Sequence, residues 1–98
     1  MIGVMIEILV IDLDDNRLDS ICDGFASVDP ILDDLCDWSI GADLSKKHIE
    51  IDMTLMSNSP DIAMARSQEI LDLVMEMSGF ARLVIADASK VTAEVISA

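Results

Sequence analysis

The chain has 98 residues, of which 52% are hydrophobic and only 3% aromatic, which is enough for one domain with a modest aliphatic core. Its formal net charge is −13 and its pI is near 4.1, which argues against direct binding to nucleic acid or to an anionic membrane. No basic start with a small-residue cleavage site is visible, and no apolar run approaches the ~20 residues of a membrane helix. We therefore expect a cytoplasmic protein, with residues 1–98 forming a single domain.

Met5–Leu13 is predicted to be a central strand, because both of its faces are largely apolar. One face would carry Ile6, Ile8 and Val10, and the opposite face Glu7, Leu9, Ile11 and Leu13. Asn16–Val28 is predicted to be a helix, capped by Asp14 or Asp15, whose apolar stripe consists of Leu18, Ile21, Cys22 and Phe25. Gly24 should weaken this helix by about 1 kcal/mol relative to alanine. Asp29-Pro30 should end it, because a residue before proline avoids helical geometry.

The next two strands are predicted over Cys36–Leu44 and His48–Met56, where apolar and polar residues alternate. A short polar connection joins them, which is typical of an antiparallel hairpin. Pro60–Ser78 is predicted to be a second helix, with Ser59 as its cap and Gly79 at its end. Its main apolar stripe would contain Ala63, Ile70, Val74 and Met77, widened by Met64, Leu71 and Met75.

Phe80–Asp87 is predicted to be the last main strand, followed by a turn at Ala88–Lys90. Val91–Ile96 would form an extra edge strand or hang loose. The order strand–helix–strand–strand–helix–strand is that of the ferredoxin-like βαββαβ sandwich, an α+β fold. In this plan two helices cover one face of an antiparallel sheet and leave the other face open.

The open face is the candidate functional surface. Its hairpin would present Asp37, Ser39, Asp43, His48, Glu50, Asp52 and Thr54, and the first strand would add Leu9, Ile11 and Leu13. We expect its four carboxylates to raise one another's pKa values. An apolar midline rimmed by acids suits an interface, either in a homodimer or with a basic protein partner. The alternative is an ordinary solvated sheet surface.

Catalytic, cofactor and metal sites are not expected. Asp12 and Asp14 after an apolar strand resemble the first motif of haloacid-dehalogenase-like phosphotransferases, but the match covers seven residues of a much larger domain. Asp12–Asp23 has the acid spacing of a calcium loop, but Arg17 stands where glycine makes the turn. His48 is the sole histidine, so a His/Cys metal cluster is excluded. Cys22 and Cys36 are expected to be buried, reduced core residues. We therefore expect a protein that is not an enzyme.

Two stretches of the sequence resemble those of known proteins. One is Asn16-Arg17-Leu18-Asp19 at the start of the first predicted helix, and the other runs from His48–Met56 through Ser57-Asn58-Ser59-Pro60-Asp61 into the second helix. The chain resembles small acidic ferredoxin-like proteins of actinobacteria and their bacteriophages, which implies the fold and an accessory role. The leading hypothesis is a non-enzymatic protein-interaction module acting through the open face. Asp12–Asp43 contains ten acids and one base, so an alternative is an inhibitor that mimics nucleic acid. A regulatory domain that binds a small ligand is a further alternative.

Overall fold

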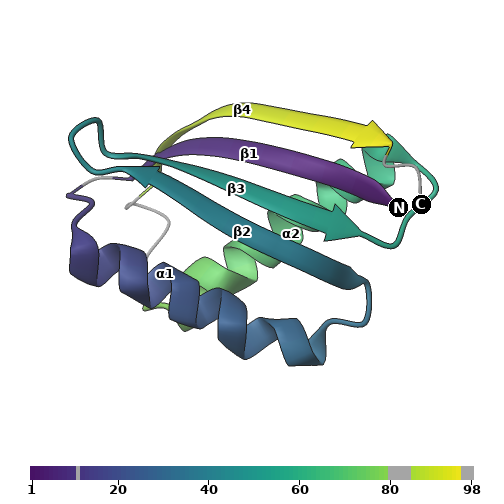
Figure 1. The fold of residues 1–98 in the computed structure, drawn as a ribbon, viewed down its shortest axis with the longest axis horizontal. Coiled ribbons are helices and arrows are strands. Elements are labelled where there is room, and N and C mark those ends of the chain that lie inside the picture. The colour runs from purple at the N-terminus through teal and green to yellow at the C-terminus, as the bar shows by residue number, and fades with distance from the viewer. Residues whose placement is uncertain (11, 80–84, 96–98) are drawn as a thin grey trace.

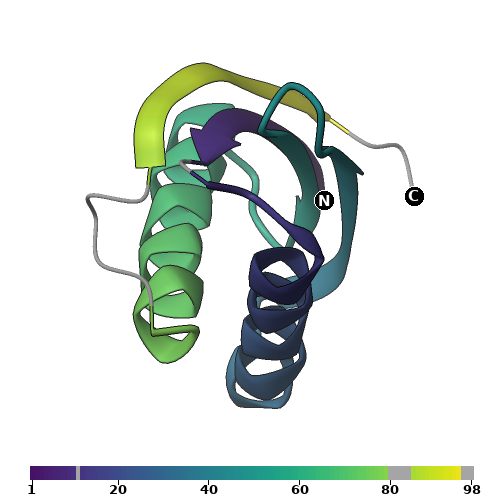
Figure 2. The same ribbon diagram turned by 90° about the vertical axis from the view of Figure 1, so that its left-hand side faces the viewer.

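The computed structural model describes residues 1–10 and 12–79, together with the strand through residues 85–95. The elements are, in chain order, β1 (Ile2–Val10), α1 (Asp15–Val28), the short 3-10 helix η1 (Asp29–Ile31), β2 (Leu35–Asp43), β3 (His48–Leu55), α2 (Pro60–Met77) and β4 (Ile85–Val95). The strands form one antiparallel sheet in the order β2-β3-β1-β4. Both helices lie against the same side of this sheet (Figures 1 and 2). The predicted ferredoxin-like α+β fold is confirmed.

The last strand differs from the prediction. β4 runs without interruption from Ile85 to Val95 beside β1, so the turn expected at Ala88–Lys90 and a separate strand over Val91–Ile96 are both wrong. Two register shifts occur in this pairing, between Glu7 and Ile8 and between Leu9 and Val10 of β1. They allow β4 to stay paired with β1 although apolar and polar residues do not alternate strictly along β4. The predicted start at Phe80 lies outside the described residues.

The core lies between the sheet and the helices. Alternate side chains of the two central strands point into it and are at most 1% exposed: Ile2, Val4, Ile6, Ile8, Val10, Ile49, Ile51, Met53 and Leu55. From α1, Ile21, Phe25 and Val28 are buried against them. The buried face of α2 consists of Ala63, Ser67, Ile70, Leu71, Val74 and Met75. Met77, expected in the stripe, is 51% exposed, because the contact line of α2 follows Leu71 and Met75 instead.

β1 is shifted toward the N-terminus relative to the predicted strand, since it begins at Ile2 and ends at Val10. Asp12 has φ +56°, which turns the chain out of the extended conformation. The Leu13 amide then donates to the Val10 carbonyl over 3.3 Å, and Lys47 Nζ donates to the Leu13 carbonyl over 2.8 Å. This turn directs the Leu13 side chain into the core, where it is fully buried.

The helix termini follow their sequence signals. Asp14 caps α1, accepting a 2.8 Å hydrogen bond from the Arg17 amide at its Oδ1. Ser59 caps α2 and Pro60 occupies its first turn. Gly79 has φ +80° directly after α2, the left-handed conformation that favours glycine at this position.

The start of β2 corrects the prediction for Cys36. A register shift between Leu35 and Asp37 marks a bulge, at which Cys36 is the extra residue. Leu35 is buried opposite Leu55, in the core position expected for the cysteine, and Cys36 is exposed instead. The alternation resumes after the bulge, so that Trp38 faces the helices and stacks on Phe25 with ring centroids 5.0 Å apart.

Candidate functional site

The side of the sheet away from the helices carries the candidate site. The strand register arranges its residues in rows that cross β2, β3 and β1. These rows are Asp43–His48–Leu9, Gly41–Glu50–Glu7, Ser39–Asp52–Met5 and Asp37–Thr54–Gly3. We call the surface formed by these twelve residues the open face. Figure 2 shows that neither helix covers it. The structure therefore places Asp37, Asp43, His48, Glu50 and Asp52 on one surface, as predicted.

The apolar midline is smaller than predicted. Leu9 lies on the open face and is 38% exposed. Leu13 does not belong to this face, because the turn at Asp12 directs it into the core. Ile11 lies outside the described residues. Met5 contributes in their place, since its register position opposite Asp52 is on the same side of β1 as Leu9. The sequence contains this signal, because Met5 and Leu9 share the parity of Glu7.

The carboxylates of the open face are not equivalent. Glu7 and Glu50 stand directly opposite each other on neighbouring strands, and like charges in this position destabilise a sheet. On its other side, Glu7 pairs in register with Lys90 of β4. Each of the four rows contains at least one acid, including Glu7, Glu50 and Asp52 on the two central strands, while Leu9 and Met5 supply large apolar side chains, so the face offers an interface both apolar anchors and negative charge.

Asp43 belongs structurally to the β2–β3 turn. Its Oδ1 accepts hydrogen bonds from the Ser45 hydroxyl over 2.6 Å and from the Ser45 amide over 3.1 Å. The hydrogen bond from the Ser45 hydroxyl is the main reason that the pKa of Asp43 is lowered, and hydrogen bonding and charge from Lys46 add to the effect. The expectation that neighbouring acids raise the pKa of this carboxyl is therefore wrong.

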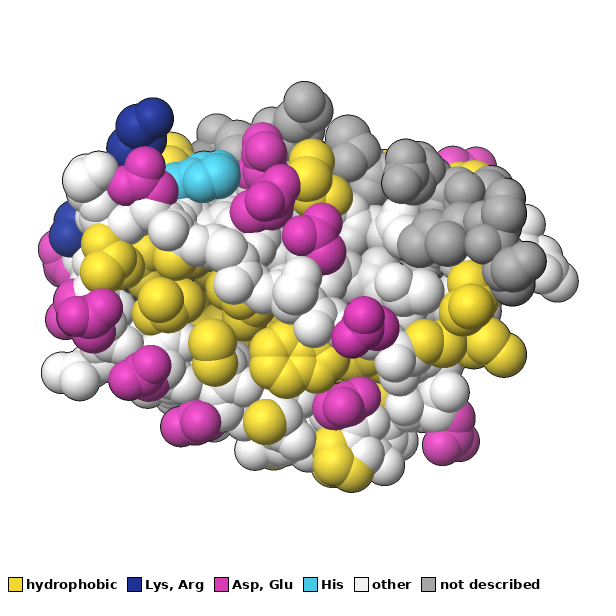
Figure 3. Space-filling view, in the orientation of Figure 1, with side chains coloured by type: hydrophobic (Ala, Val, Ile, Leu, Met, Phe, Trp, Pro, Cys, Tyr) yellow, Lys and Arg dark blue, Asp and Glu magenta, His cyan; other side chains and the backbone are white. Residues whose placement is uncertain are grey.

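A second surface was not anticipated from the sequence. Five partly buried residues lie where the outer edge of β2 approaches α1: Leu18, Cys22, Trp38, Ile40 and Leu44. We call this surface the β2–α1 strip. Figure 3 shows hydrophobic side chains running along this side of the molecule with acidic side chains on both sides. The alternation in β2 and the apolar stripe of α1 assign these residues to the core, and only the tertiary structure shows that they are left partly uncovered.

The acids beside the β2–α1 strip come largely from α1. Asp15, Asp19 and Asp23 are exposed and four residues apart, so they lie along one face of the helix at intervals of about 6 Å. Burial raises the pKa of the Cys22 thiol, and the charges of Asp19 and Asp23 raise it further. Asp19 is one turn before Cys22 on α1 and Asp23 directly follows it, so two carboxylates lie close to a residue of the strip.

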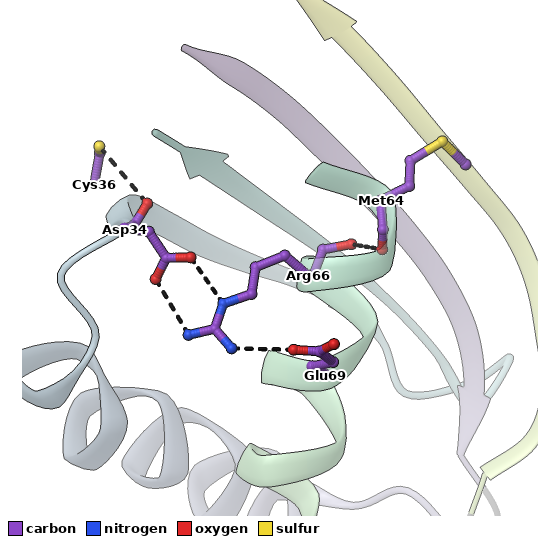
Figure 4. Close-up of polar contacts among 6 residues, drawn as sticks. Asp34, Cys36, Met64, Arg66 and Glu69 are labelled. Carbon is purple, nitrogen blue, oxygen red and sulfur yellow. Dashed lines mark hydrogen bonds and ion pairs between the residues drawn. The ribbon is translucent and has the colours of Figure 1, made fainter. Parts of the chain in front are cut away.

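Among the described residues, the most extensive ion-pair cluster is structural. Arg66 of α2 donates to both carboxylate oxygens of Asp34, with Nε–Oδ2 2.7 Å and Nη2–Oδ1 3.3 Å, and its Nη1 donates to Glu69 over 3.1 Å (Figure 4). Arg66 and Asp34 are only about one-third exposed. Because both arms of the guanidinium are engaged, this cluster fastens α2 to the segment before β2 rather than offering a free reactive group.

The calcium loop considered from the sequence is not supported by the geometry of the described residues. The calcium-loop spacing falls on the cap and first turns of α1, where Asp14 is already occupied as a cap. Within the described ranges, no group of three or more His, Cys, Asp and Glu side chains is placed to hold a metal ion.

An open hollow of about 280 Å³, lined by Met1, Met56, Ser57 and Asn58, lies at the end of β3. None of the described helices has the length and apolar character needed to cross a bilayer.

Comparison with known proteins establishes the fold and not the function. No protein-family model and no curated protein matches the sequence significantly. A solved structure of a putative antibiotic biosynthesis monooxygenase from Chloroflexus aurantiacus superposes with a TM-score of 0.61 at 13% identity, covering 99% of this chain and 93% of that one. A putative antibiotic biosynthesis monooxygenase from Bordetella bronchiseptica gives a TM-score of 0.55 at 17% identity, covering 99% and 97%.

A third similar structure is a dimeric ferredoxin-like protein of unknown function from Thermobifida fusca. Its TM-score is 0.54 at 12% identity, and the alignment covers 95% of this chain and 88% of that one. At such identities these structures share the architecture, and their activities and assembly are properties of those proteins.

Proposed function

We propose that this chain is a non-enzymatic protein-interaction module that self-associates through its open face. The observation that carries this proposal is the one-sided cover of the sheet, which leaves Leu9 of a central strand 38% exposed among polar neighbours (Figure 2). A large, partly exposed apolar side chain on a central strand of an uncovered sheet is a natural anchor for a second sheet. The Thermobifida fusca protein of the same fold, described as dimeric, supports this reading.

The open face can supply a large part of a standard interface. Its three strands, about 4.8 Å apart and paired over eight residues at about 3.3 Å each, project to roughly 380 Å². Side chains standing on that area expose more surface than its projection, and standard interfaces bury about 800 Å² per partner. The face is also preorganised, because its residues stand on paired strands rather than on loops, and this lowers the entropic cost of association.

Charge determines how such an association must behave. Two copies of net charge −13 repel each other, and Glu7, Glu50 and Asp52 add local repulsion on the open face. Salt reduces that repulsion, since the Debye length falls from about 10 Å at 0.1 M to about 3 Å at 1 M. Self-association should therefore strengthen with ionic strength, whereas binding of a basic protein to the same face should weaken.

The test is analytical ultracentrifugation of the wild type, Leu9→Asp and Leu73→Asp over a range of concentrations. Leu73 is a matched control, because it is 37% exposed on α2 while Leu9 is 38% exposed on the open face. Leu9→Asp should weaken the dimer at least about tenfold, the effect of charging an interface anchor, while Leu73→Asp should leave it unchanged. Circular dichroism confirms that both variants fold. A monomeric wild type at high concentration and high salt would contradict the proposal.

A further inference from the structure

The outer edge of β2 has the features of a peptide-docking edge. β2 is the last strand of the sheet on its side, so within the described chain no strand pairs with its outer edge. In Figure 1 this edge forms a border of the sheet above α1. An unpaired strand edge presents a row of backbone donors and acceptors that an added strand can use.

The hydrogen bonds of Trp38 show which backbone groups face outward. The Trp38 amide donates to Asp37 Oδ1 over 2.9 Å, so it is not used in the β2–β3 ladder. In an antiparallel pair, amides of one parity point to the partner strand and those of the other parity point away. The amides of Ile40 and Ala42 therefore also point away from β3. One of the three outward amides is capped by a carboxylate, and the edge is only partly protected.

The β2–α1 strip lies directly below that edge. Trp38 and Ile40 come from the edge strand itself, and Leu18 and Cys22 come from α1. All four side chains are only partly buried, so apolar atoms of a partner placed against them would remove the rest of their surface from water. A strand added to β2 would place every second side chain over this strip.

The charge around the strip selects the kind of partner. Asp19 and Asp23 border the strip from α1, and Asp37, at the margin of the open face, caps the Trp38 amide on the outer edge of β2. In Figure 3 acidic side chains lie on both sides of the strip, and the basic side chains visible on this face lie at one end. A second copy of the chain, with net charge −13, is a poor match for this edge, and a positively charged segment is a good one.

We propose that the outer edge of β2 binds an extended basic segment of a partner protein, in which basic and apolar residues alternate. Its backbone would pair with Ile40 and Ala42, its apolar side chains would cover Trp38 and Ile40, and its basic side chains would face the surrounding carboxylates. This inference does not depend on self-association through the open face, because it uses a different surface.

Trp38 supplies the readout, since it is the only tryptophan and the chain has no tyrosine. The probe is the heptapeptide Lys-Val-Lys-Val-Lys-Val-Lys, acetylated and amidated, titrated into the full chain. Binding should shift the Trp38 emission to shorter wavelength as water is excluded, and the affinity should fall with added salt. An all-lysine heptapeptide should bind at least about tenfold more weakly, because it cannot cover the strip.

Three variants locate the site. Ala42→Pro removes an outward amide, which an edge strand tolerates, and should weaken binding at least about fivefold, with Ala42→Val as its control. Asp19→Asn combined with Asp23→Asn should weaken binding about tenfold. Glu50→Gln combined with Asp52→Asn removes the same charge from the open face and should leave the affinity within about twofold.

Two results would overturn the inference. One is a wild-type Trp38 emission that does not change at saturating peptide, with peptide binding measured independently by calorimetry. The other is an affinity that Ala42→Pro leaves unchanged and the open-face double variant abolishes. If Ala42→Pro folds poorly by circular dichroism, the comparison between the two double variants decides alone, because neither changes the backbone.

Discussion

Arg66 and Asp34 are 32 residues apart in sequence and form a two-point ion pair between α2 and the segment that leads into β2. The hydrogen bonds from Arg66 hold the pKa of Asp34 below its usual value of 3.8. The adjacent backbone continues this connection, since the Asp34 carbonyl accepts from the Met56 amide over 2.9 Å. Asp34 thus connects the start of β2, the end of β3 and α2 at one point.

Asp34→Asn should destabilise the fold by up to about 1 kcal/mol at pH 7, since the pair is partly exposed. A carboxyl whose pKa is lowered on folding stabilises above its unfolded pKa, and the contribution is lost as pH falls through the folded value. The difference between wild type and Asp34→Asn should therefore be constant near neutrality and shrink below about pH 4. Urea denaturation at several pH values measures it, and Glu69→Gln, at a more exposed position, should have a smaller effect. A difference independent of pH would contradict this account.

Gly24 marks a close approach of α1 to the end of α2. A Cβ atom there would lie 2.4 Å from Ser78 Oγ and 3.0 Å from the Val74 carbonyl oxygen. Ser78 Oγ is itself held by hydrogen bonds to the carbonyls of Ser20, 3.0 Å away, and Val74, 2.7 Å away. Gly24→Ala should therefore destabilise the protein by about 1–3 kcal/mol, although alanine is the better helix former.

A double-mutant cycle with Ser78→Ala checks the reason for that loss. Without Ser78 Oγ, the nearest obstacle to a new Cβ is removed, so Gly24→Ala should cost less in the Ser78→Ala background. Thermal denaturation of the four proteins gives the coupling free energy. If Gly24→Ala stabilises the wild type, helix propensity outweighs packing and the interpretation fails.

The two cysteines should differ in reactivity toward a disulfide reagent such as DTNB. Cys36 is exposed at the bulge, whereas burial and the nearby Asp19 and Asp23 raise the pKa of the half-buried Cys22. The thiolate is the reactive form, so Cys36 should react at least about tenfold faster than Cys22 near pH 8. Cys22→Ser and Cys36→Ser variants separate the two rates. Asp19→Asn combined with Asp23→Asn should accelerate Cys22 and leave Cys36 unaffected.

Charge neutralisation should have opposite signs at two acidic positions. Glu50 stands opposite Glu7 across the sheet, so Glu50→Gln should stabilise the fold by about 0.2–1 kcal/mol at low salt. Asp61 lies in the first turn of α2, where a negative charge is favourable, so Asp61→Asn should destabilise by about 0.3–1 kcal/mol. Both differences should shrink in 1 M NaCl, because salt screens exposed charges. Effects of equal sign, or effects unchanged by salt, would contradict the prediction.

Local patterns in the sequence determined the architecture of this protein. Alternation in β3 and the caps at Asp14 and Ser59 depend on neighbouring residues only, so they predict elements to within a few positions. The order of those elements then restricts the topology to the ferredoxin-like plan.

The tertiary structure decided what each surface offers. Leu13 was expected on the open face and is buried, because a left-handed residue at Asp12 redirects the chain. Cys36 was expected in the core and is exposed, because a bulge at Leu35–Asp37 shifts the register by one residue. Alternation cannot foresee either event, since a turn or a bulge interrupts the two-residue period on which the prediction depends. The β2–α1 strip likewise depends on how closely α1 approaches the sheet edge, which long-range packing sets and no local sequence pattern records.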